Sequence, residues 1–273
     1  MPDRTWLGAV THLRAVREPG VLVTLAAVRG HAPRAAGAKL VVSADQTWGS
    51  IGGGNVEAVA VDRARDMLGT NGTVPETFTL ALSDKAPYEH GVQCCGGSVT
   101  VLLEPLAVVP AVAVFGVGHV GLELARILAR HDIELHLVDT RPEQLAEDRL
   151  AVLSDAVAAV HVHRVAVLPE IVLGELPAGT HVLIMTHDHA EDFALCDAVL
   201  RGGEFGSIGL IGSAAKWARF RTKLAAQGHD DAALARITTP IGLADIRGKE
   251  PAMIAVSVAA DLLRTSSAVD AQA

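Results

Sequence analysis

The fold of the larger part of this chain is indicated by the sequence Val114-Phe115-Gly116-Val117-Gly118-His119-Val120-Gly121. The apolar residues before the glycines predict a strand, and the residues after them predict a helix over 120–130. Asp139 ends the next predicted strand, 18 residues after Gly121. Glycines at this spacing permit a tight turn, the helix N-terminus favours a phosphate, and the distal acidic residue takes a ribose hydroxyl in dinucleotide-binding folds. The combination predicts a Rossmann-like fold.

The sequence around this loop alternates regularly between strand and helix patterns. Strands are expected near 112–115, 134–138, 181–186 and 205–211, with helices near 120–130, 190–200 and 214–226. Such alternation is typical of a doubly wound parallel sheet. A last helix is predicted from Pro251, a residue favoured at the first helical position, to Leu263.

The residues before this alternation show a mixed pattern. A helix is expected over 4–17, and strands over 21–28, from 39, over 77–82 and over 98–103. Asn55 is the expected N-cap of a helix that follows three glycines. The prolines at 105 and 110 indicate a domain boundary. We therefore expect an α/β protein with a smaller mixed α+β N-terminal domain (1–107), a Rossmann-like doubly wound parallel-sheet domain (108–265) and a tail (266–273).

Composition excludes several classes of protein. The net charge of −8 argues against a nucleic-acid surface, which needs clustered Lys and Arg. No run of 18 uncharged apolar residues predicts a membrane span, and the segment Met1–Trp6 does not resemble a signal peptide. Three cysteines, two of them adjacent, make no disulfide framework, so we expect a cytoplasmic protein.

The ligand of the glycine loop is left open by the motif. A nicotinamide dinucleotide, another phosphate ester and no ligand at all are each compatible with it. Arg141 has three alternatives: pairing with Asp139, contacting a ligand phosphate, or covering the next helix. No Tyr-x-x-x-Lys pair stands beside the loop to support hydride transfer.

Two polar segments follow later strands of the predicted sheet. His187 and His189 lie where open α/β sheets bind ligands, so they are candidate metal ligands or hydrogen-bonding groups, although their segment could also serve as a helix cap. Ser213, after Gly212, is a natural N-cap, and Lys216 one turn later could reach an anion.

The N-terminal part holds a second glycine turn. Gly53 and Gly54 precede a helix, and Arg34 and Lys39 lie close by in sequence. Together they could form an anion cradle, or the glycines could form an ordinary tight connection.

The adjacent Cys94 and Cys95 stand among glycines, in the segment 91–97. A buried inert pair, a soft metal ligand and a redox pair are the alternatives, and the last is disfavoured because the spacing is not Cys-x-x-Cys. Cys196, at an apolar helix position, is expected in the core.

Together these segments resemble the XdhC/CoxI family, the xanthine dehydrogenase accessory proteins. The matching segments are His31-Ala32-Pro33-Arg34, Gly37-Ala38-Lys39, Ile51-Gly52-Gly53-Gly54 with Glu57, Gln93-Cys94-Cys95-Gly96-Gly97, the loop 116–121, Asp139-Thr140-Arg141, Thr186-His187-Asp188-His189, Gly209-Leu210-Ile211-Gly212-Ser213 with Lys216 and Phe220, Pro240-Ile241-Gly242-Leu243 and Gly248-Lys249-Glu250-Pro251-Ala252. They span nearly the whole chain in order. Asn55 departs from the pattern after the glycines.

The resemblance implies a chaperone for the molybdenum cofactor without turnover of its own. Such a protein binds Mo-molybdopterin, protects it while a cysteine desulfurase installs the terminal sulfido ligand, and inserts it into apo xanthine dehydrogenase or a related molybdenum hydroxylase. A homodimer is also implied. The rival functions are an NAD(P)-dependent oxidoreductase, which would bind NAD(P) at the glycine loop, and a non-catalytic adaptor between desulfurase and apoenzyme.

The resemblance also implies where the cofactor binds. Phosphate would suit the helix start at 116–121 or at 212–213, Arg34 and Gln93 could meet pterin or oxo groups, and Cys94 or Cys95 could touch molybdenum or carry sulfur. The expected cofactor-binding residues are Arg34, Lys39, Gly53, Gly54, Gln93, Gly96, Gly116, Gly118, His119, Gly121, Asp139, Arg141, His187, His189, Gly212, Ser213 and Lys216.

Overall fold

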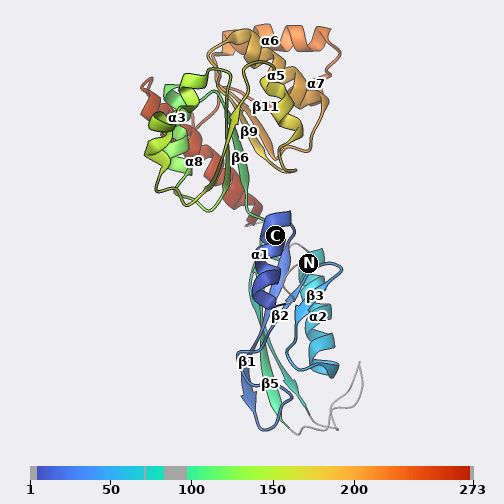
Figure 1. Ribbon diagram of the computed structural model, residues 1–273. Coiled ribbons are helices and arrows are strands. Elements are labelled where there is room, and N and C mark those ends of the chain that lie inside the picture. Colours follow the sequence, from blue (N-terminus) through green and yellow to red (C-terminus); the bar gives the residue numbers. More distant parts are fainter. Residues whose placement is uncertain (1–4, 71, 83–96, 271–273) are drawn as a thin grey trace. The chain divides into compact units, whose positions relative to one another are not determined.

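The computed structural model describes residues 5–70, 72–82 and 97–270, without the side chains of 265–270. The chain divides into two compact units, over residues 1–108 and 109–268 (Figure 1). None of the helices in the described ranges is long and apolar enough to cross a membrane.

The first unit is an antiparallel sheet with a helix on each face. Its elements are α1 (Trp6–Val16), β1 (Gly20–Arg29), β2 (Lys39–Val42), β3 (Thr47–Gly49), α2 (Gly54–Gly69), β4 (Glu76–Ala81) and β5 (Ser98–Leu106). The strands lie in the order β3-β2-β1-β5-β4. Side chains alternate across a strand, so Leu40 and Val42 pack with α2 residues in one core while Val41 packs with Leu13 of α1 in another.

The expected cap at Asn55 was wrong. Helix α2 begins at Gly54, Gly53 is its N-cap, and Asn55 is buried. Gly52, Gly53 and Gly54 all have positive φ, a conformation that allows the chain to enter the helix without a side-chain cap.

The second unit is a six-stranded parallel sheet. Its elements are β6 (Ala111–Phe115), α3 (His119–Leu128), β7 (Glu134–Asp139), η1 (Pro142–Leu145), α4 (Glu147–Leu150), η2 (Ala151–Leu153), β8 (Ala159–Arg164), η3 (Pro169–Gly174), β9 (His181–Ile184), α5 (His189–Arg201), β10 (Ser207–Leu210), α6 (Ala214–Ala226), α7 (Asp231–Leu234), β11 (Ile237–Thr238) and α8 (Pro251–Asp270). The order β8-β7-β6-β9-β10-β11 is that of a dinucleotide-binding doubly wound sheet. The Rossmann-like prediction is confirmed.

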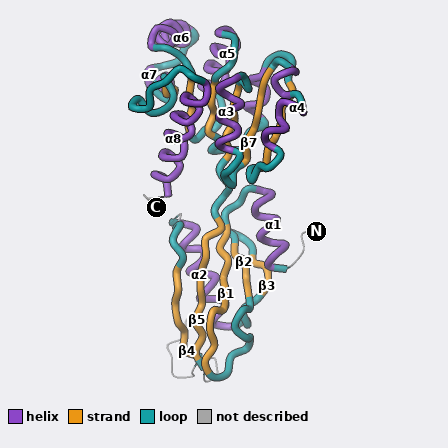
Figure 2. The backbone as a smooth tube through the Cα atoms, turned by 90° about the vertical axis from the view of Figure 1, so that its left-hand side faces the viewer, coloured by secondary structure: helices purple, strands orange, loops and turns teal. Residues whose placement is uncertain are grey.

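Helices cover both faces of this sheet. Figure 1 shows α3 and α8 on one side and α5, α6 and α7 on the other, and Figure 2 shows the layers from a second direction. Leu124 of α3 and Val258 of α8 join one core, whereas Leu195 of α5 and Leu224 of α6 join the other. The strand β6 between them is buried along its whole length, as its apolar sequence predicts.

Three features of this unit differ from the prediction. The sequence pattern missed β8 and β11, because β8 is an edge strand with polar residues at alternate positions and β11 has two residues. Helix α8 continues to Asp270, so residues 266–270, expected in a tail, are helical. Its earlier turns pack on the sheet, and extending a formed helix adds one hydrogen bond for each residue fixed.

Candidate functional site

The candidate site lies at the carboxyl ends of the parallel strands of the second unit. The loops after β6, β7, β9 and β10 begin at Gly116, Thr140, Met185 and Ile211, and Asp139 is the last residue of β7. The strand order reverses between β6 and β9, and ligands of open α/β sheets bind at the crevice outside this switch point. The topology therefore brings together the motifs singled out from the sequence in this unit.

Two glycines of the first loop are required by close backbone packing. Gly116 has φ of 101°, and a Cβ there would lie 2.3 Å from the Met185 carbonyl oxygen. A Cβ at Gly121 would lie 2.1 Å from the Gly116 carbonyl oxygen. Gly116 therefore allows the loop to pack against the end of β9, and Gly121 allows α3 to pack against the loop.

Gly118 has open space instead. A Cβ at this position would meet one atom within 4 Å, the Arg141 Nη2 at 3.8 Å. Gly118 is also the N-cap of α3, and no side chain caps this helix. His119, the first helical residue, is exposed. The start of α3 is therefore accessible to an anion and has a guanidinium beside it.

Asp139 and Arg141 form a buried ion pair at the end of β7. The Arg141 Nε donates to Asp139 Oδ1 at 3.0 Å and its Nη2 donates to Oδ2 at 2.9 Å. The backbone N–H groups of Arg141 (2.9 Å) and Val117 (2.7 Å) donate to the same two oxygens. Burial raises the pKa of Asp139, but these hydrogen bonds outweigh it and leave the pKa below its ordinary value.

The structure contains the first of the three alternatives for Arg141, pairing with the Asp139 carboxylate. Both Asp139 oxygens already accept two hydrogen bonds, so the carboxylate is engaged within the chain rather than presented to a ribose hydroxyl. The Arg141 side chain keeps 27 % of its surface exposed. It is therefore held in place by Asp139 while one side faces the start of α3.

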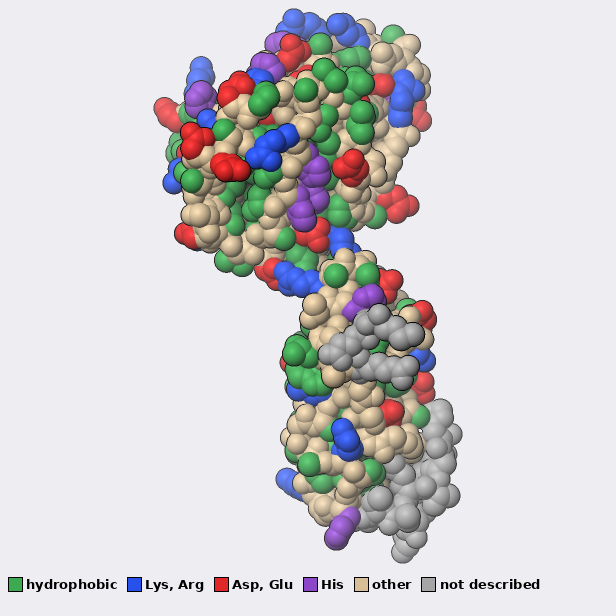
Figure 3. Space-filling model, viewed as in Figure 1, with side chains coloured by type: hydrophobic (Ala, Val, Ile, Leu, Met, Phe, Trp, Pro, Cys, Tyr) green, Lys and Arg blue, Asp and Glu red, His purple; other side chains and the backbone are tan. Residues whose placement is uncertain are grey.

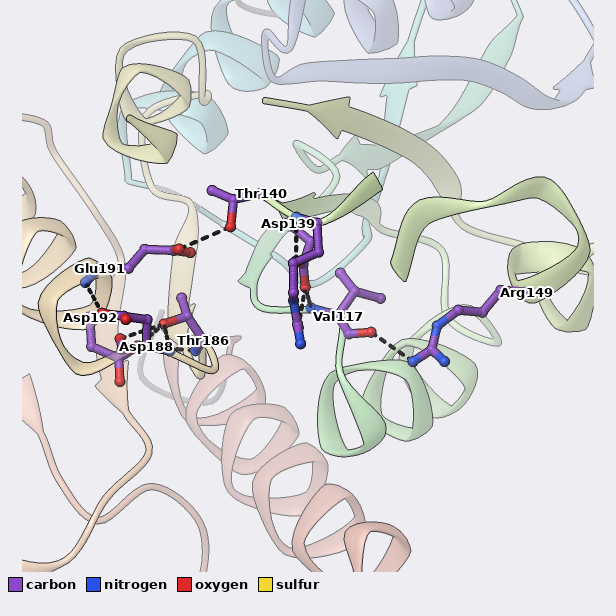
Figure 4. Close-up of polar contacts among 9 residues, drawn as sticks. Val117, Asp139, Thr140, Arg149, Thr186, Asp188, Glu191 and Asp192 are labelled. Atoms are coloured by element: carbon purple, nitrogen blue, oxygen red, sulfur yellow. Dashed lines mark hydrogen bonds and ion pairs between the residues drawn. The ribbon is translucent and has the colours of Figure 1, made fainter. Parts of the chain in front are cut away.

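Arg149 is a further anchor of the glycine loop that the sequence pattern did not indicate. Its Nη2 donates to the Val117 carbonyl oxygen at 2.9 Å, as Figure 4 shows. It comes from the short helix α4, whose position depends on irregular structure after β7. The peptide between Val117 and Gly118 thus has its carbonyl fixed from one side, while the Val117 N–H is fixed by Asp139.

Lys216 is buried and pairs with a carboxylate of the chain itself. Its Nζ contacts Asp192 Oδ2 and donates to the Ile211 carbonyl oxygen at 2.9 Å. The other oxygen of Asp192 accepts from the Thr186 N–H at 3.0 Å and hydroxyl at 2.7 Å. The anion that Lys216 reaches is therefore Asp192, and the pair joins helix α6 to helix α5.

Two residues before Lys216 help to position its side chain for the pair with Asp192. The Ser213 hydroxyl accepts from the Lys216 N–H at 3.3 Å, which confirms the predicted N-cap. A Cβ at Gly212 would lie 2.7 Å from Lys216 Cδ, so the glycine leaves room for the lysine stem.

Cys196 is fully buried nearby in the core, as predicted, and burial raises the pKa of its thiol to about 12.

The segment around His187 and His189 is exposed, and Asp188 caps α5. The Asp188 Oδ1 accepts from the N–H groups of Ala190 (2.5 Å) and Glu191 (3.1 Å). Within the described ranges, neither histidine belongs to a group of three or more side chains with metal-ligand atoms within 4.8 Å of one another. The segment therefore does cap helix α5, as one of the alternatives stated. The geometry of the described residues gives no support for a metal site at His187 and His189.

Glu191 extends the network toward β7. Its Oε2 accepts from the Thr140 hydroxyl at 3.0 Å (Figure 4). Burial raises the pKa of Glu191, and the charges of Asp139 and Asp192 add to this, against the hydrogen bond from Thr140. Three carboxylates thus lie at the loop ends: Asp139 paired with Arg141, Asp192 paired with Lys216, and Glu191 bonded to Thr140.

The candidate cradle of the first unit is lined by the chain's own carboxylate. Glu57 Oε2 accepts from the Ser50 hydroxyl (2.6 Å) and from the N–H groups of Ile51 (3.0 Å) and Gly53 (3.1 Å). A Cβ at Gly52 would lie 3.4 Å from Arg34 Cγ, so the exposed Arg34 runs beside the glycines.

Two more of the predicted residues of the first unit, Lys39 and Gly54, adjoin this turn. The Lys39 Nζ donates to the Thr24 hydroxyl at 2.8 Å and lies 5.5 Å from the centre of the Trp6 ring. Gly54 is exposed as the first residue of α2. The roles predicted for Gln93, Cys94, Cys95 and Gly96 concern residues outside those that the structure describes.

Comparison with known proteins identifies the family. Residues 112–262 match the model of the XdhC Rossmann domain, and residues 13–79 match that of the XdhC and CoxI family. The chain belongs to the XdhC/CoxI family. The predicted resemblance is confirmed.

Two relatives from Escherichia coli K12 are similar to this XdhC/CoxI chain. The uncharacterized protein YqeB is 24% identical over 249 residues, which cover 91% of this chain and 44% of YqeB. The molybdenum cofactor insertion chaperone PaoD is 37% identical over 87 residues, 32% of this chain and 26% of PaoD. The matches thus span less than half the length of either relative.

A solved structure supports the fold of this XdhC/CoxI protein. The crystal structure of a protein described as a xanthine dehydrogenase from Bacillus halodurans matches with a TM-score of 0.50 and 19% identity, over 97% of this chain and 96% of the other. At this identity the likeness concerns the fold alone.

Proposed function

We propose that this XdhC/CoxI protein is a chaperone that binds the molybdenum cofactor and inserts it into an apoenzyme. Membership of the family and the similarity to the insertion chaperone PaoD support this role. More specifically, it protects Mo-molybdopterin in the cytoplasm while a cysteine desulfurase adds the terminal sulfido ligand. It then delivers the cofactor, as a homodimer, to apo xanthine dehydrogenase or a related molybdenum hydroxylase.

The observation that carries the proposal is the open anion site at the start of α3. Molybdopterin ends in a phosphate, which requires hydrogen-bond donors and positive charge. Gly118 allows the backbone to be approached, the uncapped helix offers N–H groups with a favourable dipole, and the Arg141 guanidinium stands beside them. Because Asp139 holds the guanidinium in place, little ordering is needed when a phosphate binds.

The same geometry argues against the NAD(P)-dependent oxidoreductase. That function uses the acidic residue after the second strand to hold a ribose hydroxyl. Here both Asp139 oxygens are engaged by Arg141 and Val117. A phosphate ester without a ribose makes no demand on Asp139, so molybdopterin suits this loop better than a dinucleotide.

The other predicted residues take roles away from the phosphate. Arg34 and Gln93 contact pterin or oxo groups, and Cys94 or Cys95 contacts molybdenum or carries sulfur during transfer. His187, in the loop after β9, and His189, the first residue of α5, are exposed hydrogen-bonding groups. If Cys94→Ala and Cys95→Ala, singly and together, leave cofactor binding and enzyme activation unchanged, the thiols are structural.

Gly118→Ala tests the phosphate site. A methyl group there keeps the fold, since the space is open and the backbone is extended, but it separates a phosphate from the helix start. Loss of one hydrogen bond to a charged group costs about 1.5–3 kcal/mol, which is roughly 10- to 100-fold in the Kd of molybdopterin. Gly174→Ala, also in open space and in the same unit, is the matched control and leaves the Kd unchanged.

The readouts separate the rivals. Titration of the purified protein with molybdopterin, followed by fluorescence, measures the Kd of wild type and both variants. Equal affinity for molybdopterin in Gly118→Ala and wild type would show that the phosphate does not bind at the start of α3. Tight NAD(P) binding with substrate turnover would favour the oxidoreductase. Partner binding without any pterin binding would favour the adaptor.

A further inference from the structure

Histidines cluster on two neighbouring strands of the parallel-sheet unit, β7 and β8. Figure 3 shows histidine side chains gathered on the visible face of this unit. His136 lies in the middle of β7, and His161 and His163 lie on the neighbouring edge strand β8. The parallel register places His136 beside His161 and Val138 beside His163. Because alternate residues of a strand share a face, Glu134, His136, His161 and His163 all project from one side of the sheet.

Three of these side chains bring metal-ligand atoms close together. One ligand atom each from Glu134, His136 and His161 lies within 4.8 Å of the other two. The His136 Nε2 is 3.8 Å from Glu134 Oε2, and the rings of His136 and His161 stack with centroids 4.6 Å apart. Four-coordinate zinc with Zn–N bonds of about 2.0–2.1 Å holds its ligand atoms about 3.3 Å apart. Small side-chain rotations therefore suffice to close the three groups on an ion.

The fourth member of the cluster positions the first histidine. The His136 Nδ1 and His163 Nε2 are 3.0 Å apart, and His163 Nδ1 is 3.8 Å from a carboxylate oxygen of Glu175, just beyond η3. When Nδ1 of His136 donates to His163, the lone pair of His136 lies on Nε2, toward Glu134. A metal-binding histidine is usually held this way, with its other ring nitrogen bonded to an acceptor.

We propose that Glu134, His136 and His161 form a binding site for a divalent transition-metal ion, with zinc as the ion that suits two imidazoles and one carboxylate. His163 is a positioning residue for His136. His136 is buried, Glu134 is partly buried and His161 is exposed, so the fourth coordination position faces solvent. The bound ion would also join the edge strand β8 to β7.

Calorimetric titration of the tag-free, chelator-treated full chain with zinc chloride tests this site. Wild type is expected to bind one zinc ion per chain. His161→Ala and Glu134→Gln reduce the affinity by more than about 100-fold, and His163→Ala reduces it by about 10- to 100-fold, as for outer partners of known metal sites. The control is His131→Ala, a partly buried histidine of the same unit outside the cluster, which binds as wild type.

Two further measurements keep the test decisive. His161 is exposed, so circular dichroism of His161→Ala without metal should match wild type, and zinc should raise the Tm of wild type but not of this variant. Cobalt(II) in place of zinc should give the strong visible absorption of a four-coordinate ion in wild type only. No zinc binding by wild type, or undiminished binding by both His161→Ala and Glu134→Gln, would overturn the proposal.

Discussion

The ion pair between Asp139 and Arg141 allows a quantitative prediction. Arg141→Met removes two of the four donors to a carboxylate that is 3 % exposed, and leaves the backbone donors of Val117 and of residue 141. Breaking a buried pair costs about 3–5 kcal/mol. Two donors remain and the guanidinium is 27 % exposed, so we expect a loss of about 2–3 kcal/mol in the free energy of unfolding.

The effect can be read from thermal unfolding. For a unit of this size, 1 kcal/mol corresponds to about 2–4 °C, so the Tm of the second unit should fall by about 4–12 °C at pH 7. Arg126→Met is the matched control, because Arg126 forms an exposed pair with Glu123 in the same unit. Exposed pairs contribute about 0–1 kcal/mol, so its Tm should change by a few degrees at most.

The pH dependence gives an independent check with a defined sign. The pKa of Asp139 is lowered in the folded state, so its stabilising contribution is present above the unfolded value of about 3.9 and is lost as the pH falls through the folded pKa. In Arg141→Met burial dominates and the pKa of Asp139 rises. The gap in stability between wild type and variant should therefore shrink from pH 7 to pH 4. A gap that is constant with pH, or a variant as stable as Arg126→Met, would show that the ion pair does not stabilise the unit in this way.

Three further predictions follow from buried contacts. Lys216→Met leaves a buried carboxylate without its cation and should cost about 3–5 kcal/mol in urea unfolding, whereas the same change at the exposed Lys223 should cost less than about 1 kcal/mol; equal losses would contradict the buried pair. Gly121→Ala puts a methyl group 2.1 Å from a carbonyl oxygen and should lower the Tm far more than Gly118→Ala does. Thermal unfolding followed by circular dichroism measures both Tm values. Burial raises the pKa of the Cys196 thiol to about 12, so this thiol should resist iodoacetamide at pH 8 in the native protein and react after unfolding. Labelling is measured by mass spectrometry. A label on Cys196 of the native protein would contradict the prediction.

The sequence was sufficient to predict the fold class of the parallel-sheet unit and the close backbone packing at two of its glycines. Strand, glycine loop and distal Asp139 are local features, so the roles of Gly116 and Gly121 follow from the pattern once the fold is fixed. The N-cap at Ser213 was predictable for the same reason, since a cap needs only the residues of its own first turn.

Contacts that depend on topology were not predictable. Lys216 was expected to reach an anion, but the anion is Asp192, which comes from a different helix and meets the lysine because β9 and β10 are neighbours. Arg149 reaches the glycine loop from a four-residue helix that no periodicity marks.

The partners of the N-terminal turn and of the histidine cluster also depend on structure. Glu57 turned out to hold the N–H groups of its own glycine turn, which the sequence left as a possible anion cradle. The histidines of β8 alternate with valines on a strand that the pattern missed, and their partner His136 is on another strand. Register between strands, rather than spacing along the chain, brings these groups together.

Cofactor carriage by this protein can be measured on the protein purified without oxygen from cells that make the molybdenum cofactor. The pterin fluorescence after oxidation and the molybdenum content are determined together. We expect both signals in wild type, near one per chain, and a reduced amount of both in Gly118→Ala but not in Gly174→Ala. Neither pterin nor molybdenum in wild type, where the cofactor is abundant, would contradict it.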